Sequence, residues 1–279
     1  MDKIINDFIK KSLAEDIGAG DITSQACIDT DALGKAQLIA KENCQIAGID
    51  IAAEIYSLYD KKLDFKSFKK DGETIKKNDI IFSIFGNQQS ILATERLVLN
   101  CMQRMSGIAT KTRKFVDKIR DLNTVILDRR KTSPSIRFLE KEAVKIGGGE
   151  NHRHGLYDVI MIKDNHIDFS GGIPNAIKNC SEYLETNGGG MKIIIEVRNL
   201  TELNQVLNSG GVDRILLDNF SILKTKEAVD IINSKYETES SGNIGLNNVR
   251  EYALCGVNYI SIGNLTHSIK SIDLSMQCI

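Results

Sequence analysis

Six short apolar runs in the second half of the chain each end on a residue that could bind a ligand. The residues at these ends are Asp128, Lys163, Glu196, Asp218, Ser240-Ser241-Gly242 and Gly263. The carboxyl ends of parallel strands converge on one rim, which is where α/β barrels bind their ligands. A single charged residue at a strand end can simply be solvated, but six polar or glycine endings together predict a shared ligand site.

A cationic stretch begins directly after the first of these runs. It carries Arg129, Arg130, Lys131, Arg137, Lys141, Lys145, Arg153 and Lys163. Only four acidic residues oppose these eight, in a chain whose formal net charge is −1. Arginine binds carboxylate and phosphate through two parallel charge-assisted hydrogen bonds. The stretch therefore predicts a small ligand that carries several negative charges.

Two carboxylates and two loops of small residues complete the predicted rim. In a cationic basin, Glu196 and Asp218 could orient sugar hydroxyls or hold Mg²⁺ against a diphosphate. The loops Ser240-Ser241-Gly242 and Ser261-Ile262-Gly263 each precede a predicted helix start, where backbone N–H groups can hold phosphate. Among the histidines, His152 and His267 are predicted anion donors, and no spacing typical of a zinc site occurs.

Strands and helices alternate after about residue 120, and this alternation must position the rim. The predicted strands are residues 124–127, 158–162, 192–195, 214–217, 236–239 and 258–262. The predicted helices are residues 136–145, 174–184, 200–208, 221–233 and 246–255. Alternating strands and helices are typical of a parallel sheet. Six strands, where a full α/β barrel has eight, predict an incomplete barrel.

The first half of the chain has a different pattern. Ile5, Phe8, Ile9 and Leu13 recur at helical spacing and predict a helix within residues 1–20. Short strands are predicted at 36–41, 63–68 and 79–85, and a long helix is predicted from Gln89. This half is an α+β unit without obvious chemistry.

Composition and charge exclude several classes of protein. The chain has 279 residues, 36 Lys and Arg against 37 Asp and Glu, 42% hydrophobic residues and no tryptophan. A balanced charge without an aromatic and basic surface argues against nucleic acid as a partner. We expect no membrane span and no signal peptide, because charges interrupt every apolar run. Six scattered cysteines predict a reduced, cytoplasmic protein.

Several motifs occur in a fixed order along the chain. They are Thr94-Glu95-Arg96, Asp128-Arg129-Arg130-Lys131-Thr132, the segment 147–166, Ile195-Glu196-Val197, Leu217-Asp218-Asn219, Ser241-Gly242 and Leu265-Thr266-His267. In this order the sequence resembles the quinolinate phosphoribosyltransferases, also called carboxylating nicotinate-nucleotide pyrophosphorylases. The segment 147–166 is the most specific part of the resemblance.

The resemblance implies a reaction and a fold. Members of this family join quinolinate to phosphoribosyl pyrophosphate, with Mg²⁺, and form nicotinate mononucleotide, pyrophosphate and CO₂. The implied fold is an N-terminal α/β sandwich, expected over residues 1–105 with 268–279 returning to it, and a TIM-like incomplete α/β barrel over 106–267. It also implies a homodimer, or a hexamer assembled from such dimers, in which the sandwich of one chain caps the barrel of the other.

Site roles follow from the resemblance residue by residue. The predicted catalytic residues are Lys131, Lys163, Glu196 and Asp218. The predicted substrate-binding set adds Arg96, Arg129, Arg130, His152, Arg153, Ser240, Ser241, Gly242, Ser261, Ile262, Gly263 and His267. Arg96 would reach quinolinate in the neighbouring chain's site. The family usually has threonine where Arg129 stands, and this arginine could add a phosphate contact.

The implied reaction depends on charge placement. Pyrophosphate leaves from C1 of the ribose, so cations must already face its developing charge. The pyridine nitrogen must lie in line with C1, which Arg96, Arg130 and Arg153 would achieve by binding the two carboxylates. The 2-carboxylate then leaves as CO₂, and the quaternised ring nitrogen accepts the electron pair.

Three alternative functions stay open at the level of sequence. A related protein of molybdenum transport operons shares the fold but lacks the patterns at 151–153 and 163–166. A lyase could use Lys163 as a Schiff base, which borohydride trapping would detect. A non-catalytic sensor of a phosphorylated metabolite would be stabilised by its ligand without forming product.

Overall fold

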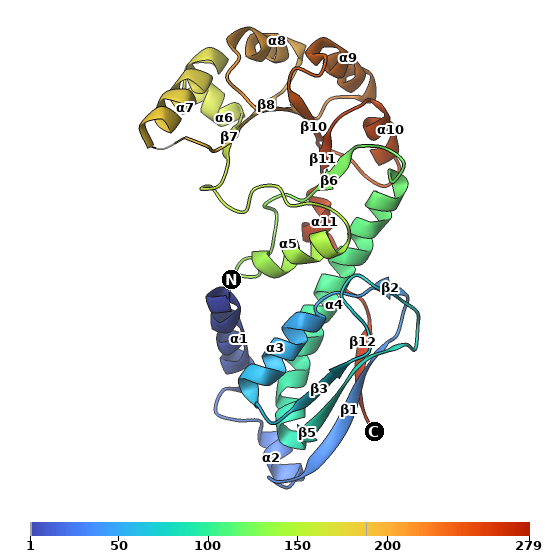
Figure 1. Cartoon of the computed structure of the whole chain (residues 1–279). Coiled ribbons are helices and arrows are strands. Elements are labelled where there is room, and N and C mark those ends of the chain that lie inside the picture. Colours follow the sequence, from blue (N-terminus) through green and yellow to red (C-terminus); the bar gives the residue numbers. More distant parts are fainter. Residues whose placement is uncertain (1, 188) are drawn as a thin grey trace. The chain divides into compact units, whose positions relative to one another are not determined.

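The computed structural model describes residues 2–187 and 189–279, and the chain divides into two compact units. The first unit comprises Met1–Arg113, Thr132–Gly148 and Leu265–Ile279, and the second comprises Lys114–Lys131 and Gly149–Asn264. Each unit is built around its own sheet (Figure 1). The predicted fold class, an α/β sandwich followed by an incomplete α/β barrel, is confirmed. The predicted limits of the two domains stay a prediction.

The first unit contains a four-stranded antiparallel sheet in the order β12-β1-β5-β3. Its strands are β1 (Leu33–Ala40), β3 (Asp64–Ser67), β5 (Ile80–Asn87) and β12 (Leu274–Cys278), and β2 (Cys44–Gln45) pairs separately with β4 (Thr74–Ile75). Alternate residues of β1, namely Ala36, Leu38 and Ala40, are buried. This period of two places one face of the sheet against the core.

The first unit contains the two longest helices predicted from sequence, α1 (Asp2–Ile17) and α4 (Gln88–Lys118), and the last turn of α4 belongs to the second unit. Its other helices are α2 (Ile22–Cys27), α3 (Ile49–Tyr59), α5 (Arg137–Ile146) and α11 (Asn264–His267), which begins in the second unit. Tyr56 of α3 packs on the sheet through Phe65 and Phe82, with ring centroids 5.9 and 6.0 Å apart. The sequence analysis did not predict α3 or β12.

A close approach joins α4 to the C-terminal segment. The backbone N–H of Ile272 donates to the carbonyl of Gln103 at 3.0 Å, and the side chain of Gln103 donates to the carbonyl of Leu274 at 3.1 Å. One turn further along α4, a Cβ added at Gly107 would lie 2.4 Å from the carbonyl oxygen of Lys270. Backbone cannot yield as a flexible side chain does, so this crossing requires glycine.

The second unit contains a six-stranded parallel sheet in the order β6-β11-β10-β9-β8-β7. Its strands are β6 (Val125–Leu127), β7 (Ile160–Ile162), β8 (Ile193–Val197), β9 (Arg214–Asp218), β10 (Glu237–Ser241) and β11 (Tyr259–Ser261). All six strands predicted for this half are therefore confirmed. β6 and β7 do not pair, and the barrel is open there; a single bridge between Leu127 and Glu150 continues the sheet past β6.

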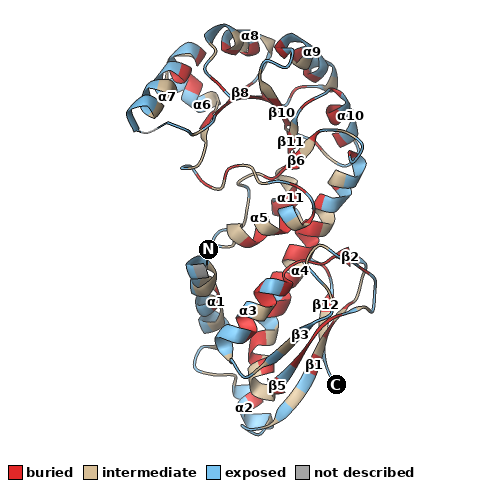
Figure 2. Cartoon of the chain, viewed as in Figure 1, coloured by how far each residue is buried: buried red, intermediate tan, exposed pale blue. Residues whose placement is uncertain are grey.

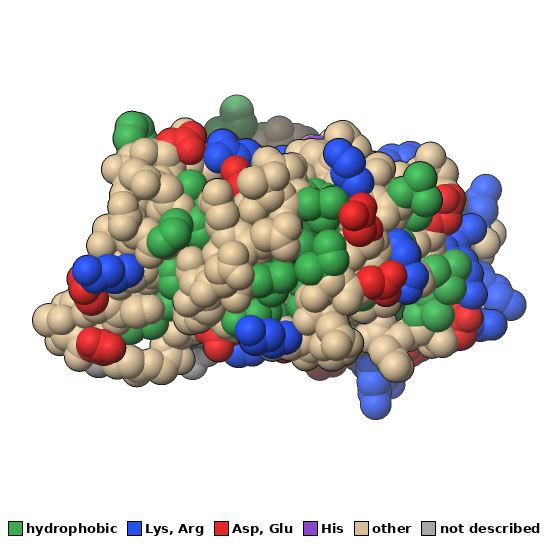
Figure 3. Space-filling model, turned by 90° about the horizontal axis from the view of Figure 1, so that it is seen from above, with side chains coloured by type: hydrophobic (Ala, Val, Ile, Leu, Met, Phe, Trp, Pro, Cys, Tyr) green, Lys and Arg blue, Asp and Glu red, His purple; other side chains and the backbone are tan. Residues whose placement is uncertain are grey.

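Helices cover the outer face of this sheet (Figures 1 and 2). They are α6 (Asp164–Phe169), α7 (Ile173–Asn187), α8 (Leu200–Ser209), α9 (Ile222–Ile232) and α10 (Val249–Leu254). All of these except α6 were predicted. A view from above shows hydrophobic, acidic and basic side chains mixed over one face of the molecule (Figure 3). In the described part of the chain, no helix has the length and apolarity needed to cross a membrane.

Strand alternation decides which side chains enter the barrel. On β8, Ile193, Ile195 and Val197 pack outward in the core formed with the helices. Ile194 points to the other side, where it packs with Met161 and Leu216. Because successive residues of a strand face opposite sides, Glu196 shares the inner face with Ile194. The apolar outer face thus fixes which polar residues the barrel interior receives.

We expect Gly107→Ala to lower the free energy of unfolding by about 1–3 kcal/mol, because the added methyl overpacks the crossing of α4 and the C-terminal segment. Gly189→Ala is the control, since its nearest neighbour, the carbonyl oxygen of Leu184, would be 3.9 Å from the new Cβ. Thermal denaturation measures both variants against the parent chain. Equal melting temperatures for all three would contradict the close approach.

Candidate active site

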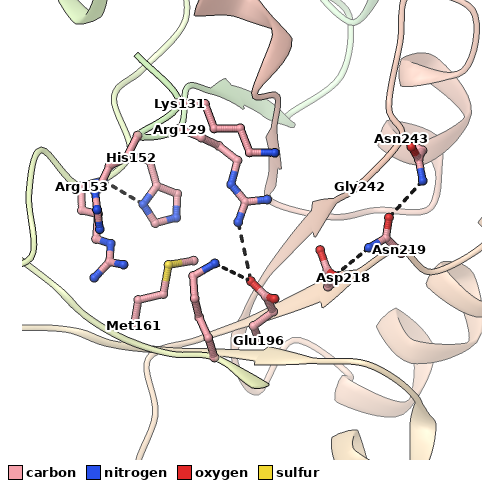
Figure 4. Close-up of a pocket in the computed structure, with 12 residues that line it drawn as sticks. Arg129, Lys131, His152, Arg153, Met161, Glu196, Asp218, Asn219, Gly242 and Asn243 are labelled. Carbon is pink, nitrogen blue, oxygen red and sulfur yellow. Dashed lines mark hydrogen bonds and ion pairs between the residues drawn. The ribbon is translucent and has the colours of Figure 1, made fainter. Parts of the chain in front are cut away.

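A cavity of about 570 Å³ opens at the carboxyl edge of the barrel strands. We call it the rim pocket. It is lined by residues that follow β6, by the loop before β7, and by the ends of β7, β8, β9 and β10 (Figure 4). The lining residues are Arg129, Arg130, Lys131, His152, Arg153, Met161, Lys163, Glu196, Asp218, Asn219, Gly242 and Asn243. All of them belong to the second unit.

The rim pocket brings together nine of the residues predicted from sequence. These are Arg129, Arg130, Lys131, His152, Arg153, Lys163, Glu196, Asp218 and Gly242. Ser240, Ser241, Ser261, Ile262 and Gly263 lie at the ends of β10 and β11 but are not among the lining residues. Arg96, exposed on α4, and His267, exposed at the end of α11, belong to the first unit. The binding roles of all these residues stay predictions.

Positive charge exceeds negative charge in the rim pocket. Five lining residues are Lys or Arg and two are carboxylates. Burial, together with the neighbouring charge of Arg130, lowers the pKa of Arg153, which is only 9% exposed. The Nε of Arg130 is buried and has no hydrogen-bond partner among the described residues. Crowded, partly unsatisfied guanidinium groups favour an anionic ligand, because buried charges need a partner.

Glu196 is the carboxylate that the cations of the pocket share. It lies 3.2 Å from the Nζ of Lys163 and 3.6 Å from a guanidinium nitrogen of Arg129. A second nitrogen of Arg129 donates to the hydroxyl of Ser241. Arg129 thus connects the end of β8 to the end of β10 across the rim.

The loop before β7 holds His152 and Arg153 at the rim. The backbone of Glu150 exchanges hydrogen bonds with Ile126 and Asp128, so the loop runs beside the extension of β6. The buried carboxylate of Asp128 accepts from the backbone N–H of His152 at 2.9 Å. The guanidinium of Arg153 donates to the carbonyl of Val159 at 3.3 Å. The loop is therefore anchored on both sides of the two pocket residues.

Two asparagines of the rim pocket were missed by the sequence analysis. Asn219 donates to Asp218 at 2.7 Å and accepts from Asn243 at 3.1 Å, so its amide connects two strand ends. Both asparagines have positive φ, which asparagine tolerates better than most residues. Their position directly after strand ends was the available signal. A Cβ at Gly242, whose φ is +96°, would lie 2.9 Å from the backbone nitrogen of Asn219, so glycine is required there.

His166 has a structural role that the amino-acid sequence did not indicate. Its Nδ1 accepts from the backbone N–H of Lys163 at 3.0 Å, which closes the N-terminus of α6. The side chain of Lys163 is thereby carried by a fixed backbone at the end of β7. The Nζ of this lysine donates to Glu196 at 3.2 Å.

These observations define a class of protein: an α/β barrel whose strand ends place several Lys and Arg side chains around one cavity, where α/β barrels bind their ligands. The sequence model for the C-terminal domain of quinolinate phosphoribosyl transferase matches residues 108–277, and that for its N-terminal domain matches residues 21–106. The chain therefore belongs to the quinolinate phosphoribosyltransferase family.

Individual relatives agree with the family models over nearly the whole chain. The chain is 42% identical to the chloroplastic carboxylating nicotinate-nucleotide pyrophosphorylase of Arabidopsis thaliana, over 96% of this chain and 81% of that protein. It is 40% identical to the probable carboxylating enzyme of Bacillus subtilis (strain 168), over 98% and 92%. The structure of the nicotinate-nucleotide pyrophosphorylase from Francisella tularensis has a TM-score of 0.93 at 40% identity, over 100% and 97%.

We expect inorganic pyrophosphate to raise the melting temperature by several degrees, because a ligand at about 100 times its Kd stabilises the folded state by about 2.7 kcal/mol. Arg130→Ala should reduce this shift by removing a cation of the rim pocket. Lys178→Ala, an exposed position on α7, is the control and should keep it. Sodium chloride at matched ionic strength separates binding from screening. An equal shift in both variants would contradict the assignment of the pocket.

Proposed function

We propose that the rim pocket is the active site in which this enzyme joins quinolinate to phosphoribosyl pyrophosphate. The enzyme carries out the decarboxylating reaction for which the relatives are named, and its products are nicotinate mononucleotide, pyrophosphate and CO₂. This reaction belongs to the de novo biosynthesis of NAD. The observation that supports the location is the excess of Lys and Arg over carboxylates around one cavity.

The charge of the pocket matches the charge of both substrates. Quinolinate carries two carboxylates, and phosphoribosyl pyrophosphate carries a diphosphate and a 5′-phosphate. Arg130 and Arg153 would bind the quinolinate carboxylates, since the planar guanidinium forms two parallel bonds to such a group. Fixing both carboxylates orients the ring nitrogen towards C1 of the ribose, and this orientation lowers the barrier for joining two molecules.

Transition-state stabilisation would come from cations that are already in place. Pyrophosphate gains negative charge as its bond to C1 breaks, and Lys131 and Lys163 would face that charge. After transfer, the positive charge of the quaternised ring nitrogen stabilises the electron pair that the departing 2-carboxylate leaves on C2, and a proton from water then bonds to C2. The residues of the chain bind and orient in this mechanism, and none needs to act as a nucleophile.

The ends of β9 and β10 would bind the sugar phosphate. Glycine at position 242 lets a ligand approach the backbone closely, and Ser241 lies beside it. The hydroxyl of Ser241 is engaged by Arg129. This arginine, where the family usually has threonine, would then lie near a phosphate bound at the end of β10 and add to its binding. Glu196 would orient the ribose.

Mg²⁺ would accompany phosphoribosyl pyrophosphate and neutralise part of the charge on its diphosphate. Asp218 fits as its ligand: it accepts one hydrogen bond from Asn219, and within the described ranges it forms no ion pair. Mg²⁺ usually binds through one or two carboxylates together with substrate phosphates. A cage is not required, in keeping with the absence of any cluster of three or more metal-ligating side chains among the described residues.

We further propose that the enzyme acts in the cytoplasm as a homodimer with shared sites, or as a hexamer assembled from such dimers. Arg96 is exposed on α4, and from there it would contact quinolinate bound in the site of a neighbouring chain. The six cysteines are unpaired thiols, as expected of a reducing compartment. Its partners are small-molecule substrates; nucleic acid and membrane are not proposed. The contact of Lys163 with Glu196 favours this function over a lyase, whose lysine must be uncharged to attack.

Product formation tests the proposed function. Purified protein with quinolinate, phosphoribosyl pyrophosphate and Mg²⁺ should release nicotinate mononucleotide, and label from the 2-carboxylate should appear as CO₂. Omission of the metal, with a chelator present, should abolish turnover. A protein that is stabilised by both substrates but forms no product would instead be a sensor.

We expect Arg153→Ala to weaken quinolinate binding by about 10- to 150-fold, because each charge-assisted hydrogen bond contributes about 1.5–3 kcal/mol. Arg153→Lys keeps the charge but loses the planar guanidinium group, so its affinity for quinolinate should lie between those of the parent protein and of Arg153→Ala. Calorimetric titration with quinolinate measures the affinities. Near-normal binding by Arg153→Ala would rule out its proposed role.

Mixed dimers of Arg96→Ala and Lys163→Ala chains should regain activity that neither variant has alone. In a two-fold dimer with shared sites, each mixed dimer has one intact site and one doubly altered site. Random reassociation should therefore restore about a quarter of the parent activity. Refolding the two variants together and separately measures the recovery. No gain on mixing would argue against shared sites.

A further inference from the structure

A charged network of residues on β9, β10 and β11 lies outside the lining of the rim pocket. Arg214, on β9, donates to Glu237 at 3.1 Å and to Glu239 at 3.1 Å, both on β10. Its guanidinium also lies 3.7 Å from the ring centroid of Tyr259, on β11, whose hydroxyl contacts Glu237 at 3.2 Å. None of these four residues lines the rim pocket.

Glu239 connects this network to the rim. Its side chain is completely buried, and its Oε2 lies 3.2 Å from the Nε2 of His152. Burial works to raise the pKa of Glu239, but the hydrogen bond from His152 and the charge of Arg214 outweigh it and hold the pKa below its usual value. The carboxylate is therefore a charged acceptor for His152.

The second ring nitrogen of His152 fixes where the imidazole proton lies. The backbone N–H of Arg153 donates to Nδ1 of His152 at 2.8 Å (Figure 4). A nitrogen that accepts a hydrogen bond carries no proton, so the proton is on Nε2, which faces Glu239. Both ring nitrogens are thus engaged within the chain, one with Glu239 and one with the backbone of Arg153.

We propose that Glu239 is a positioning residue for Arg153 and acts through His152. By accepting from Nε2, it holds His152 in the tautomer whose Nδ1 can accept from the Arg153 backbone. That hydrogen bond fixes the backbone from which the guanidinium of Arg153 enters the rim pocket. The inference rests on the proposed function only where it assigns Arg153 to a quinolinate carboxylate.

The tautomer of His152 provides a test that does not require turnover. The four histidines of the chain can be labelled with ¹⁵N and the His152 signals assigned with a His152→Gln variant. In the parent protein, we expect a protonated Nε2 and an unprotonated Nδ1. Glu239→Gln should shift both signals towards the average of two tautomers and raise the quinolinate Kd about tenfold.

Glu237→Gln is the matched control. It removes a carboxylate charge from the same strand, and this carboxylate also pairs with Arg214, but Glu237 has no hydrogen bond to His152. We expect this variant to keep the parent His152 spectrum and the parent quinolinate affinity. Equal loss of affinity in both variants would mean that the network only stabilises the barrel, and would overturn the proposal.

Two substitutions of His152 separate positioning from direct substrate contact. Asparagine places an amide oxygen near the position of Nδ1 and can still accept from Arg153, whereas glutamine reaches the position of Nε2. We expect His152→Asn to bind quinolinate at least tenfold more tightly than His152→Gln. The opposite order would mean that Nε2 itself contacts substrate, and would overturn the proposal.

These outcomes separate the inference from the proposed function. If the parent protein forms no nicotinate mononucleotide, the proposed function fails, yet the His152 spectrum still decides how Glu239 acts. If product forms and the spectrum of Glu239→Gln is unchanged, the function stands and the positioning role is wrong.

Discussion

The concentration of positive charge at one barrel rim is the constraint on which the rest of the second unit depends. Burial and the charge of Arg130 lower the pKa of Arg153, and such crowded guanidinium groups are stable in a fold only when other groups hold them there. Here Glu196 lies among the cations, against Lys163 and Arg129, and Glu239 lies against His152. A polyanionic ligand would relieve the repulsion that remains, and its binding would then stabilise the rim.

The barrel can hold charge in its interior because its apolar contacts lie outside. Alternate residues of β7, β8 and β9 pack against the surrounding helices, which leaves the inner face free to carry polar side chains. The inner apolar layer is small and consists of Met161, Ile194 and Leu216, with Val159 packed against it. Arg214 and its two glutamates occupy the space on the same inner face. Deep ion pairs of this kind cost desolvation, and good geometry compensates for it.

Much of this arrangement could be predicted from the sequence, because strand ends in a parallel barrel meet at one edge. Lys163, Glu196 and Asp218 were found by their position after apolar runs, and the pocket contains all three. Glu239 and Arg214 lie inside predicted strands, and no local pattern shows which residues of neighbouring short strands pair. The register that brings them together is set by the whole sheet. For that reason, the sequence alone could not show that Arg214 and Glu239 form a pair.

Other features escaped prediction for different physical reasons. The amide of Asn219 connects two strand ends through hydrogen bonds. Because an amide is uncharged, the charge pattern of the sequence did not point to this residue. Strand β12 pairs with β1, more than two hundred residues away in the chain, and only the fold brings them together. Several motifs of the family resemblance coincide with strand ends, and for that reason nine of the predicted residues line one pocket.

A crystal structure with quinolinate bound tests the central claim most directly. The account predicts both carboxylates within hydrogen-bond distance of Arg130 and Arg153, at the carboxyl edge of the barrel strands. Quinolinate bound elsewhere, or at this edge with these two side chains turned into solvent, would contradict it.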